Sequence, residues 1–325
     1  MKLKRFSAVV AVVCAFVIAG AVPAFAKYPE RPITMIVPWG AGGGSDILAR
    51  ALVKPLEKEL GQTVIVVNKA GGSGTVGTSF VAHARPDGYT IGLINSTGVI
   101  HQIHYGGVDY KKEDLDPLCL LLQSSVMLSV HADSEVKTLA DYIKYTKDHP
   151  NTTLGVAAVG GATHLAVEDF FMKAGVKVQP MPFKDGGRGA ATALVGKHIF
   201  SASNDPSELY GQIKAGTVRP LAVSNGTRLP NYPDVPTFKE LGYDSVNHVW
   251  RCFFAPKGIS AEVRDTLVKA IEKAAQDPGY LETVAKLGDT PVFMGPVEFK
   301  KYLDEDDAKM LNLIKALNLY QKNVK

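Results

Sequence analysis

Two glycine-rich loops, each between a short apolar strand pattern and a helical pattern, constrain the fold of this chain more than any other feature. The first loop spans 38–46 after the strand pattern 33–37, and the second spans 68–77 after the strand pattern 63–67. A loop of this kind places free backbone N–H groups at a helix N-terminus, where they can bind an anion. The pair therefore predicts adjacent strands whose loops converge on one anionic ligand.

Alternating strand and helix patterns continue along the chain and indicate two lobes. One series begins at 33, and a second, with its own glycine-rich loops, runs from 153 to 224. Short apolar strands joined by helices are typical of a mainly parallel sheet with helices on both faces, so we expect one such α/β sheet in each lobe. The tail has helical patterns at 260–276 and 296–320 but no third sheet, and these helices are expected to return to the first lobe.

This order predicts a discontinuous first lobe. We expect lobe 1 to comprise 27–122 and 251–325 and lobe 2 to comprise 123–250, joined by strands that cross near 118–130 and 245–255. Ligands of such sheets bind outside the carboxyl ends of the strands, where both glycine loops lie. The expected site is therefore a cleft between the lobes.

The first 26 residues are typical of an export signal. A basic start precedes an uncharged apolar run from 7 to 22, and Ala24-Phe25-Ala26 matches the small-residue cleavage pattern. The run is shorter than a membrane span, so we expect cleavage after Ala26 and a periplasmic protein in preference to a retained anchor.

The charge balance argues against nucleic-acid binding. The chain has 36 Lys and Arg against 32 Asp and Glu. Three of the basic residues, Lys2, Lys4 and Arg5, belong to the export signal, which leaves 33 against 32 in the mature chain. A near-neutral chain without a basic stripe gives no basis for a nucleic-acid partner.

Neither the cysteines nor the histidines predict a metal or a cofactor. Cys119 and Cys252 lie in apolar strand patterns, so buried free thiols are favoured over a disulfide, although the pairing stays open. His101 and His104 have no nearby carboxylate or cysteine partner, and we expect loop or surface histidines.

The second loop contains a G-x-G-x-x-G pattern at 72–77, which is found in dinucleotide-binding folds. That fingerprint needs an acidic residue about twenty positions further on. The corresponding segment, 93–96, reads Leu-Ile-Asn-Ser and has no carboxylate. We therefore expect no nucleotide cofactor.

Four side chains at glycine-rich loops of the two lobes are candidates for contact with the ligand or for support of a loop. Trp39 precedes three consecutive glycines, more than a tight turn requires, which favours ligand contact. Asp46 is expected to cap the helix or orient the loop. His164, at a helix start, is either a packing residue or a ligand contact, and Arg188 is either solvated or a carboxylate clamp.

No nucleophile–base motif appears, so we expect a binding protein, not an enzyme. The alternative is an exported hydrolase that uses the same cleft, with a nucleophile–base pair near Ser45, Ser96 or His164.

The chain also resembles a known family. Motifs at 28–46, 68–77, 86–90, 213–223, 233–242 and 254–258, among them Tyr-Pro-x-Arg-Pro-Ile, Pro-Asp-Gly-Tyr-Thr and Pro-Asp-Val-Pro-Thr-Phe, are similar to those of the substrate-binding proteins of tripartite tricarboxylate transporters. The resemblance implies a two-lobe, periplasmic-binding-protein-like clamshell (type II). Such a protein closes on a small carboxylate and delivers it, as a monomer, to a membrane permease.

The resemblance also implies ligand contacts on both lobes. Those of the first lobe are Trp39, Gly40, Ala41, Gly42, Gly43, Ala70, Gly71, Ser96 and Thr97, to which the first loop adds Ser45 and Asp46. Those of the second lobe are Gly161, Ala162, Thr163, His164, Ser203, Asn204 and Asp205, and Arg188 joins them from its position.

The second lobe departs from the family pattern. The position of the usual acid is Ser203, and an acid stands instead at Asp205. These departures argue against a family-default substrate such as citrate. We expect a di- or tricarboxylate or an aromatic carboxylate, without a choice between them. A sensory protein that presents its closed form to a receptor is a further alternative.

Overall fold

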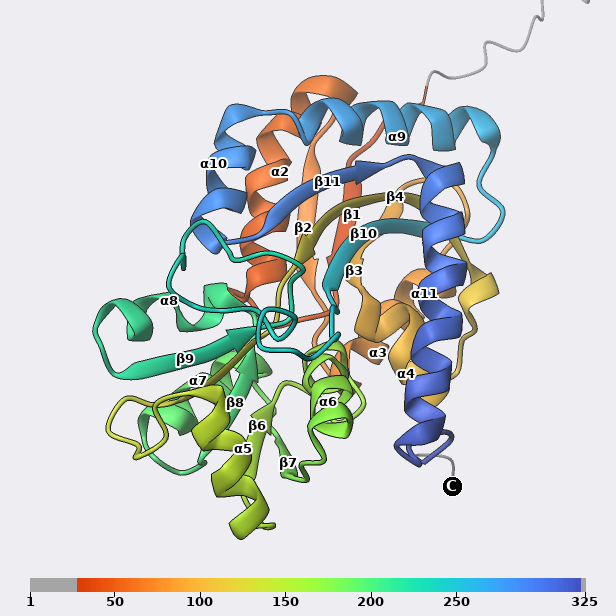
Figure 1. Ribbon diagram of the computed structural model, residues 1–325. Helices are drawn as coiled ribbons and strands as arrows, with labels where there is room; N and C mark the ends of the chain where they lie inside the picture. Colours follow the sequence, from red (N-terminus) through yellow and green to blue (C-terminus); the bar gives the residue numbers. More distant parts are fainter. Residues whose placement is uncertain (1–27, 323–325) are drawn as a thin grey trace, which may run out of the picture.

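The computed structural model describes residues 28–322, which form two α/β lobes, each built on one β-sheet (Figure 1). The predicted two-lobe α/β fold is confirmed. The predicted export signal, residues 1–26, lies outside the described residues. Within 28–322, no helix is long and apolar enough to cross a membrane.

The first sheet has six strands in the order β11-β4-β10-β3-β1-β2. They are β1 (Ile33–Val37), β2 (Val64–Asn68), β3 (Thr90–Asn95), β4 (Leu115–Ser124), β10 (Val249–Pro256) and β11 (Thr290–Met294). β1 runs parallel to β2 and β3, whereas β10 is antiparallel to β3 and β4, and β11 is antiparallel to β4. The sheet is thus mixed, not mainly parallel, because the chain leaves this lobe through β4 and returns through β10.

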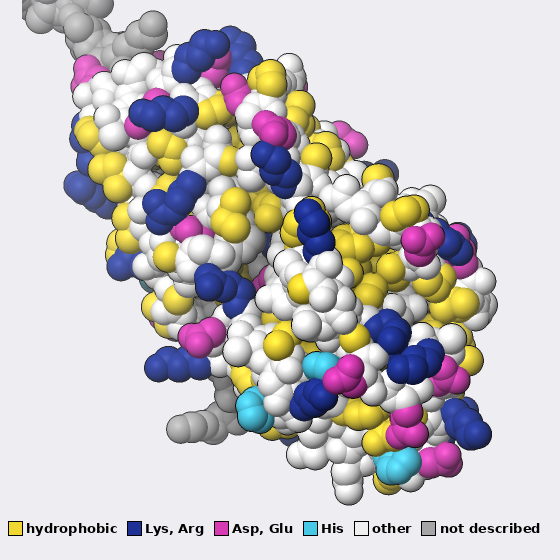
Figure 2. Space-filling model, turned by 90° about the vertical axis from the view of Figure 1, so that its left-hand side faces the viewer, with side chains coloured by type: hydrophobic (Ala, Val, Ile, Leu, Met, Phe, Trp, Pro, Cys, Tyr) yellow, Lys and Arg dark blue, Asp and Glu magenta, His cyan; other side chains and the backbone are white. Residues whose placement is uncertain are grey.

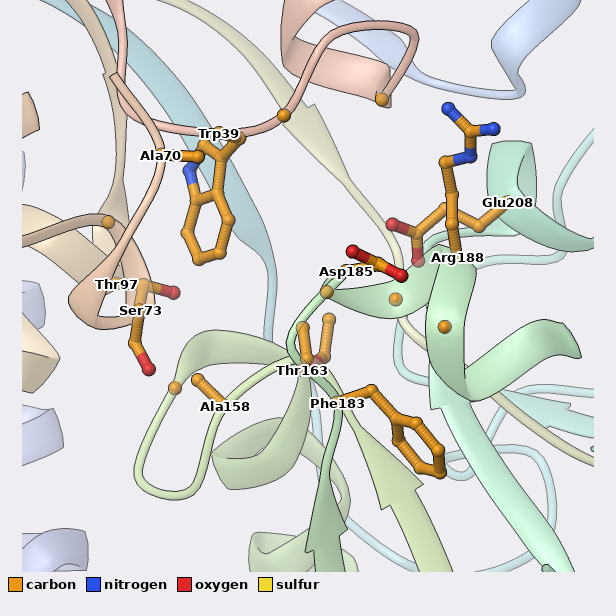
Figure 3. A pocket seen from close by; sticks show the side chains of 18 of the residues that line it. Trp39, Ala70, Ser73, Thr97, Ala158, Thr163, Phe183, Asp185, Arg188 and Glu208 are labelled. Carbon is orange, nitrogen blue, oxygen red and sulfur yellow. The ribbon is translucent and has the colours of Figure 1, made fainter. Parts of the chain in front are cut away.

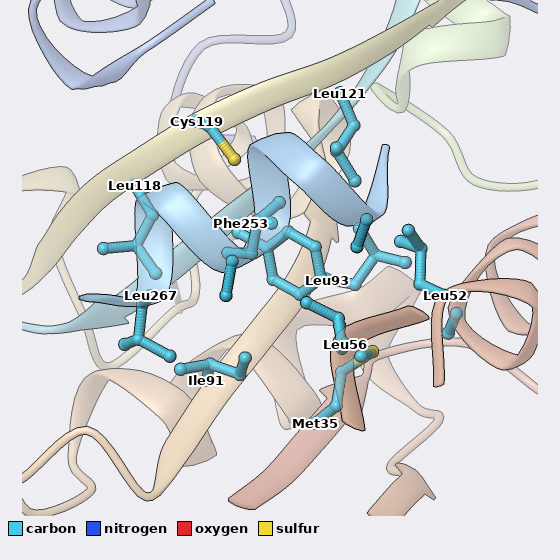
Figure 4. Close-up of a cluster of buried hydrophobic side chains, with 14 of the residues drawn as sticks. Met35, Leu52, Leu56, Ile91, Leu93, Leu118, Cys119, Leu121, Phe253 and Leu267 are labelled. Carbon is cyan, nitrogen blue, oxygen red and sulfur yellow. The ribbon is translucent and has the colours of Figure 1, made fainter. Parts of the chain in front are cut away.

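Helices cover both faces of the first sheet. One face carries α2 (Gly44–Leu60), α9 (Ala261–Ala274) and α10 (Pro278–Leu287), and the other carries α3 (Thr75–Ala82), α4 (Gln102–Tyr105) and α11 (Pro296–Ala316) (Figure 1). Short helical turns lie at Gly72–Gly74, Thr97–His101 and Lys112–Asp114. Strand side chains alternate between the two faces: Met35 enters the core under α2 and α9, shown in Figure 4, whereas Ile36 enters the core under α11.

The two cysteines follow the same alternation. Cys119 is buried in the core under α9, and Cys252 is buried in the core under α11, so their side chains lie on opposite faces of one sheet. Both are free, and the Cys252 thiol donates to Ile94 O at 3.2 Å. The prediction of buried thiols is confirmed.

The second sheet has five strands in the order β7-β6-β8-β5-β9. They are β5 (Met127–His131), β6 (Thr153–Val156), β7 (Gln179–Pro182), β8 (Ser201–Asn204) and β9 (Val218–Val223). β6 is parallel to β7 and β8, but β5 is antiparallel to β8 and β9, so this sheet is also mixed. α5 (Leu139–Asp148) and α6 (Ala162–Ala174) cover one face, and α7 (Gly187–Val195) and α8 (Pro206–Lys214) cover the other.

The predicted strand at 118–130 is two strands in two different sheets. β4 ends at Ser124 and β5 begins at Met127, and at the break Val126 exchanges hydrogen bonds with Ser224, just after β9. Gln123, Ser124 and Ser125 interrupt the apolar run at the break, but the apolar residues on both sides make 118–130 resemble one strand. The residues at which the lobes separate stay a prediction.

Two elements of the tail were not predicted, α10 and β11. β11 is an edge strand beside β4 and contains Pro291. A proline argues against a strand in a sequence pattern, yet it is tolerated at a sheet edge, where its missing N–H is not needed.

Charged side chains are interspersed over the surface. On the face shown in Figure 2, Lys and Arg alternate with Asp and Glu, and neither sign gathers into a continuous patch. This agrees with the near-neutral mature sequence.

Candidate ligand-binding cleft between the lobes

A cavity of about 1160 Å³ lies between the lobes. Its first-lobe wall consists of residues of both glycine loops with Asn95 and Thr97. Its second-lobe wall consists of residues of 157–163 and 182–193, with His198, Asp205 and Glu208, and the crossing strand β10 contributes Val249 and Arg251. Figure 3 shows Trp39 and Ala70 on one side of the cavity and Thr163, Phe183 and Asp185 on the other.

The first loop is held in shape by Asp46. The Asp46 carboxylate accepts from Gly42 N at 2.7 Å and from Arg50 Nε at 3.0 Å, and Gly42 has a φ of +74°. Burial raises the pKa of Asp46, but the hydrogen bonds from Arg50 and Gly42 outweigh it and hold the pKa below its ordinary value. Neither Asp46 nor Gly42 is among the cavity-lining residues. Asp46 therefore orients the loop, one of the two roles expected for it.

The second loop requires its glycines for backbone conformation and for close packing. Gly71, Gly72 and Gly74 all have positive φ. A Cβ on Gly74 would lie 3.0 Å from the Trp39 ring, and a Cβ on Gly77 would lie 2.7 Å from Pro38 Cα. The G-x-G-x-x-G pattern thus lets the second loop pack against the first.

The first-lobe wall presents unpaired donors. Within 28–322, the N–H groups of Gly40, Ala41, Ala70 and Gly71 have no hydrogen-bond partner, and all four residues line the cavity. The buried Trp39 Nε1 also has none. None of the lining residues of the two loops, nor Asn95 or Thr97, is titratable, and the charged side chain nearest to them on the first sheet is Arg251 of β10, which also lines the cavity. An array of N–H dipoles without a fixed counter-charge is suited to an anion.

The end of β3 links the two lobes. Thr97 lines the cavity, and its Oγ1 accepts from Ala162 N across the cleft at 3.0 Å. Ser96 is fully buried, its Oγ has no partner, and it lies behind the wall. Asn95 lines the cavity instead, although it was not among the predicted contacts.

The second-lobe candidates divide into lining and supporting residues. Those that line the cavity are Gly161, Ala162, Thr163, Arg188 and Asp205, whereas His164, Ser203 and Asn204 lie behind it. His164 Nδ1 accepts from Gly160 N at 3.0 Å, Ser203 Oγ donates to Thr163 O at 2.6 Å, and Asn204 Nδ2 donates to Gly187 O at 2.7 Å. These three side chains hold the loops that form the wall.

Arg188 reaches across the cleft. It is exposed, and its Nη1 donates to Ala41 O at 3.2 Å. One N–H of the Arg188 guanidinium therefore already donates to the first loop, next to the unpaired N–H groups of that loop.

Arg251 is a functional candidate that the sequence analysis missed. It is 3 % exposed, and its guanidinium donates to Ser45 Oγ at 3.0 Å, to Ser124 Oγ and to the Asp205 carboxylate, with Asp289 Oδ2 at 3.7 Å. It thus joins the first loop, the end of β4 and the second lobe. The sequence feature that could have identified it is the single arginine inside the apolar strand 249–256, because a buried charge needs partners.

Glu208 was also missed. It lines the cavity and lies one helical turn from Asp205, and its Oε2 accepts from Asp205 N at 3.2 Å and from Asn204 Nδ2 at 2.9 Å. Burial, followed by the charge of Asp205, raises its pKa to about 7. Burial likewise raises the pKa of Asp289 to about 6.

The serines and the histidine named for a hydrolase do not pair. Ser45 Oγ accepts from Arg251, Ser96 Oγ has no partner, and His164 bonds Gly160 N and approaches Glu168 at 3.2 Å. None of the three therefore forms a nucleophile–base pair with another in this structure.

The two histidines of the His-x-x-His pattern are not the loop or surface residues expected. His101 is 2 % exposed, and burial lowers its pKa to about 3. His104 Nε2 contacts Asp307 Oδ1 at 2.6 Å. Helix α11 buries this segment, which a local pattern could not show. In the described part of the chain, no group of three or more His, Cys, Asp or Glu could hold a metal ion.

Comparison with known proteins decides the family. A family model described as tripartite tricarboxylate transporter family receptor matches residues 48–319. The chain belongs to this family. The resemblance seen in the sequence motifs is thereby confirmed, and the family is one of solute receptors.

Three known proteins are similar to nearly the whole of this chain. Protein BugT of Bordetella pertussis is 30% identical over 320 residues, which covers 97% of this chain and 98% of BugT. The structure of the periplasmic binding protein BugD is 30% identical with a TM-score of 0.83 and covers 90% of this chain and 99% of BugD. An R. palustris protein solved with adipate is 26% identical with a TM-score of 0.82 and covers 89% and 97% of the two chains.

Proposed function

We propose that this protein is a periplasmic receptor that binds a small carboxylate in the interlobe cavity and delivers it to the membrane subunits of a tripartite transporter. The observation that carries the proposal is the first-lobe wall, where N–H groups of two glycine loops lack partners and the loop residues that line the cavity include no charged side chain. A carboxylate has two oxygens, each able to accept more than one such hydrogen bond.

The relatives support the same ligand chemistry. An R. palustris protein of similar fold was solved with adipate, a dicarboxylate, and the family to which this chain belongs is described as that of tripartite tricarboxylate transporter receptors. Binding on both lobes would favour the closed arrangement, which the membrane subunits would then recognise. We take the protein to act as a monomer after removal of residues 1–26.

Isothermal titration of the mature chain, residues 27–325, tests the proposal. The panel consists of mono-, di- and tricarboxylates, aromatic carboxylates and amino acids, together with sugars and polyols that lack a carboxyl group. We expect binding with one-to-one stoichiometry by at least one carboxylate class. Binding only by solutes without a carboxyl group would contradict it.

Transport is distinguished from sensing by a separate measurement. Mature receptor added to proteoliposomes that contain the membrane subunits of a tripartite transporter from the same organism should stimulate uptake of the bound carboxylate. Binding without any stimulated uptake would favour the sensory alternative.

A further inference from the structure

The two walls of the cavity differ in their ionisable side chains. The two glycine loops with Asn95 and Thr97 have unpaired donors and no titratable side chain, and Arg251 of β10 lines the cavity beside Ser45. The second-lobe wall includes three carboxyl groups, those of Asp185, Asp205 and Glu208. Figure 3 shows Asp185 and Glu208 across the cavity from Trp39. The same second-lobe wall also includes Lys184, Arg188 and His198.

The buried part of this cluster contains more acid than base. Arg251 faces two carboxylates, Asp205 and Asp289, and Glu208 lies beside Asp205. Among these four side chains, three carboxyl groups share one guanidinium. The excess is also seen in Glu208, whose pKa is raised to about 7 first by burial and then by the Asp205 charge.

Asp205 retains an unused acceptor. Its side chain is 8% exposed, and one carboxylate oxygen is bound by Arg251, but the other, Oδ1, has no hydrogen-bond partner among the described residues. Buried carboxylate oxygens are normally hydrogen-bonded, and an unpaired one is costly. Asp205 lines the cavity, so a ligand can supply the missing donor.

The remaining cations of the wall are less suited to a second carboxylate. Lys184 and Arg188 are exposed, and one Arg188 N–H already donates to Ala41 O. Arg251 is engaged by Ser45, Ser124 and Asp205. A second carboxylate near Asp205 and Glu208 would meet like charge.

We propose that the solute is an amino carboxylate, whose protonated amine is received by Asp205 and Glu208 while its carboxylate is held by the first-lobe loops. The inference rests on the proposed function and names the ligand class of that site. An ammonium group has three N–H donors, enough for Asp205 Oδ1 and for the Glu208 carboxyl group. Its charge also balances the excess acid of the cluster.

The amine and the carboxylate need not be far apart. A Cβ on Gly44, at the start of α2, would lie 3.2 Å from the Arg251 nitrogen that binds Asp205. Asp205 is therefore close to the first loop, and short α- and β-amino acids belong in the test together with longer ones.

The experiment compares matched series of solutes by isothermal titration at pH 7. The three series are alanine, lactate and propionate; 4-aminobutyrate, 4-hydroxybutyrate and succinate; and glutamate, 2-hydroxyglutarate and glutarate. In at least one series we expect the amino member to bind at least tenfold more tightly than the other two. If in every series a solute without the amine binds at least as tightly as the amino member, the amino-carboxylate inference is wrong, but the proposal that the protein binds a carboxylate still stands. If only solutes without a carboxyl group bind, the proposed function fails as well.

A variant tests whether the acidic side chain of Glu208 causes the preference for the amino solute. Glu208→Gln keeps the shape and the acceptor for Asp205 N but removes the charge, and should reduce the amino preference at least fivefold. Glu135→Gln makes the same change at an exposed residue of the second lobe and should leave the preference unchanged. An unchanged preference in folded Glu208→Gln would overturn the role of Glu208. If that variant does not fold, Asp185→Asn and the wild-type series test the same acidic wall.

Discussion

At the level of single residues, the cleft consists of groups that line the cavity and groups that hold the lining in place. Trp39, Thr97, Thr163, Asp205 and Arg188 belong to the first kind. Asp46, His164, Ser203 and Asn204 bond backbone groups of the loops. A sequence motif cannot separate the two kinds, because a supporting residue is often the chain neighbour of a lining residue, as His164 is of Thr163 and Asn204 is of Asp205.

Trp39 offers a direct test of the donor wall. Trp39→Phe keeps an aromatic ring against Gly74 but removes the unpaired Nε1 donor. One hydrogen bond contributes about 0.5–1.5 kcal/mol, so carboxylate binding should weaken by a few-fold to about tenfold in titration. Tyr320→Phe, an exposed control, should have no effect. Unchanged affinity in Trp39→Phe would show that the indole N–H does not meet the ligand.

Arg251 should matter for stability as well as for the site. Arg251→Gln leaves Asp205 and Asp289 buried without their cation. Removing one partner of a buried ion pair costs about 3–5 kcal/mol, which urea unfolding can measure. Arg264→Gln, at an exposed ion pair, should cost no more than about 1 kcal/mol. A loss in Arg251→Gln as small as in this control would contradict the cluster described here.

The raised pKa of Glu208 predicts a pH dependence of stability. An acid whose pKa rises on folding, here from 4.5 to about 7, binds more protons in the folded state, so the free energy of unfolding falls as pH rises between these values. Wild type should therefore lose stability relative to Glu208→Gln from about pH 4.5 to 7. Urea unfolding at four pH values measures this. If the difference in free energy of unfolding between wild type and Glu208→Gln does not change across this range, the raised pKa of Glu208 is contradicted. Glu135→Gln serves as the control.

At the level of secondary-structure elements, the strand–loop–helix unit explains why the two glycine loops form one surface. β1 and β2 are adjacent and parallel, so their loops leave the same edge of the sheet. Asn68 Nδ2 donates to Trp39 O at 3.0 Å and joins the loops directly. The contact between α3 and the first loop needs a residue without a side chain at Gly77.

Gly77→Ala should separate the two loops. The added Cβ would lie 2.7 Å from Pro38 Cα and 2.8 Å from Lys69 O, both backbone atoms. Such overpacking costs about 1–3 kcal/mol and should also weaken carboxylate binding. Gly211→Ala, in α8 with nothing within 4 Å of the new Cβ, should be neutral or slightly stabilising. Equal stabilities of these two variants would argue against the close approach.

Local patterns predicted most elements but not the pairing between them. The strands before both glycine loops and the helices after them follow from apolar periodicity. The break between β4 and β5 does not, because a short polar segment such as Gln123-Ser124-Ser125 is compatible with one long strand as well as with two strands. The mixed sheets and the buried His101 depend on contacts between distant segments, and so does the Arg251 cluster, whose members stand far apart in the sequence.

At the level of the whole molecule, the lobes contact each other around the cavity. Thr97 Oγ1 accepts from Ala162 N, Arg188 donates to Ala41 O, and Arg251 binds Asp205. All three contacts join the first-lobe side to the second lobe, and opening the cleft would break them. A ligand that contacts both walls would make all its contacts only in the closed arrangement. It would therefore bind the closed arrangement more tightly than the open one, and this difference in affinity is what favours closure.

A crystal structure of the mature chain with its tightest-binding carboxylate tests the proposed binding mode most directly. We predict carboxylate oxygens within hydrogen-bond distance of the N–H groups of Ala70 and Gly71 and of the first loop, with the rest of the solute facing Asp205 and Glu208. A carboxylate bound only by second-lobe side chains, with the first-lobe N–H groups still unpaired, would contradict it.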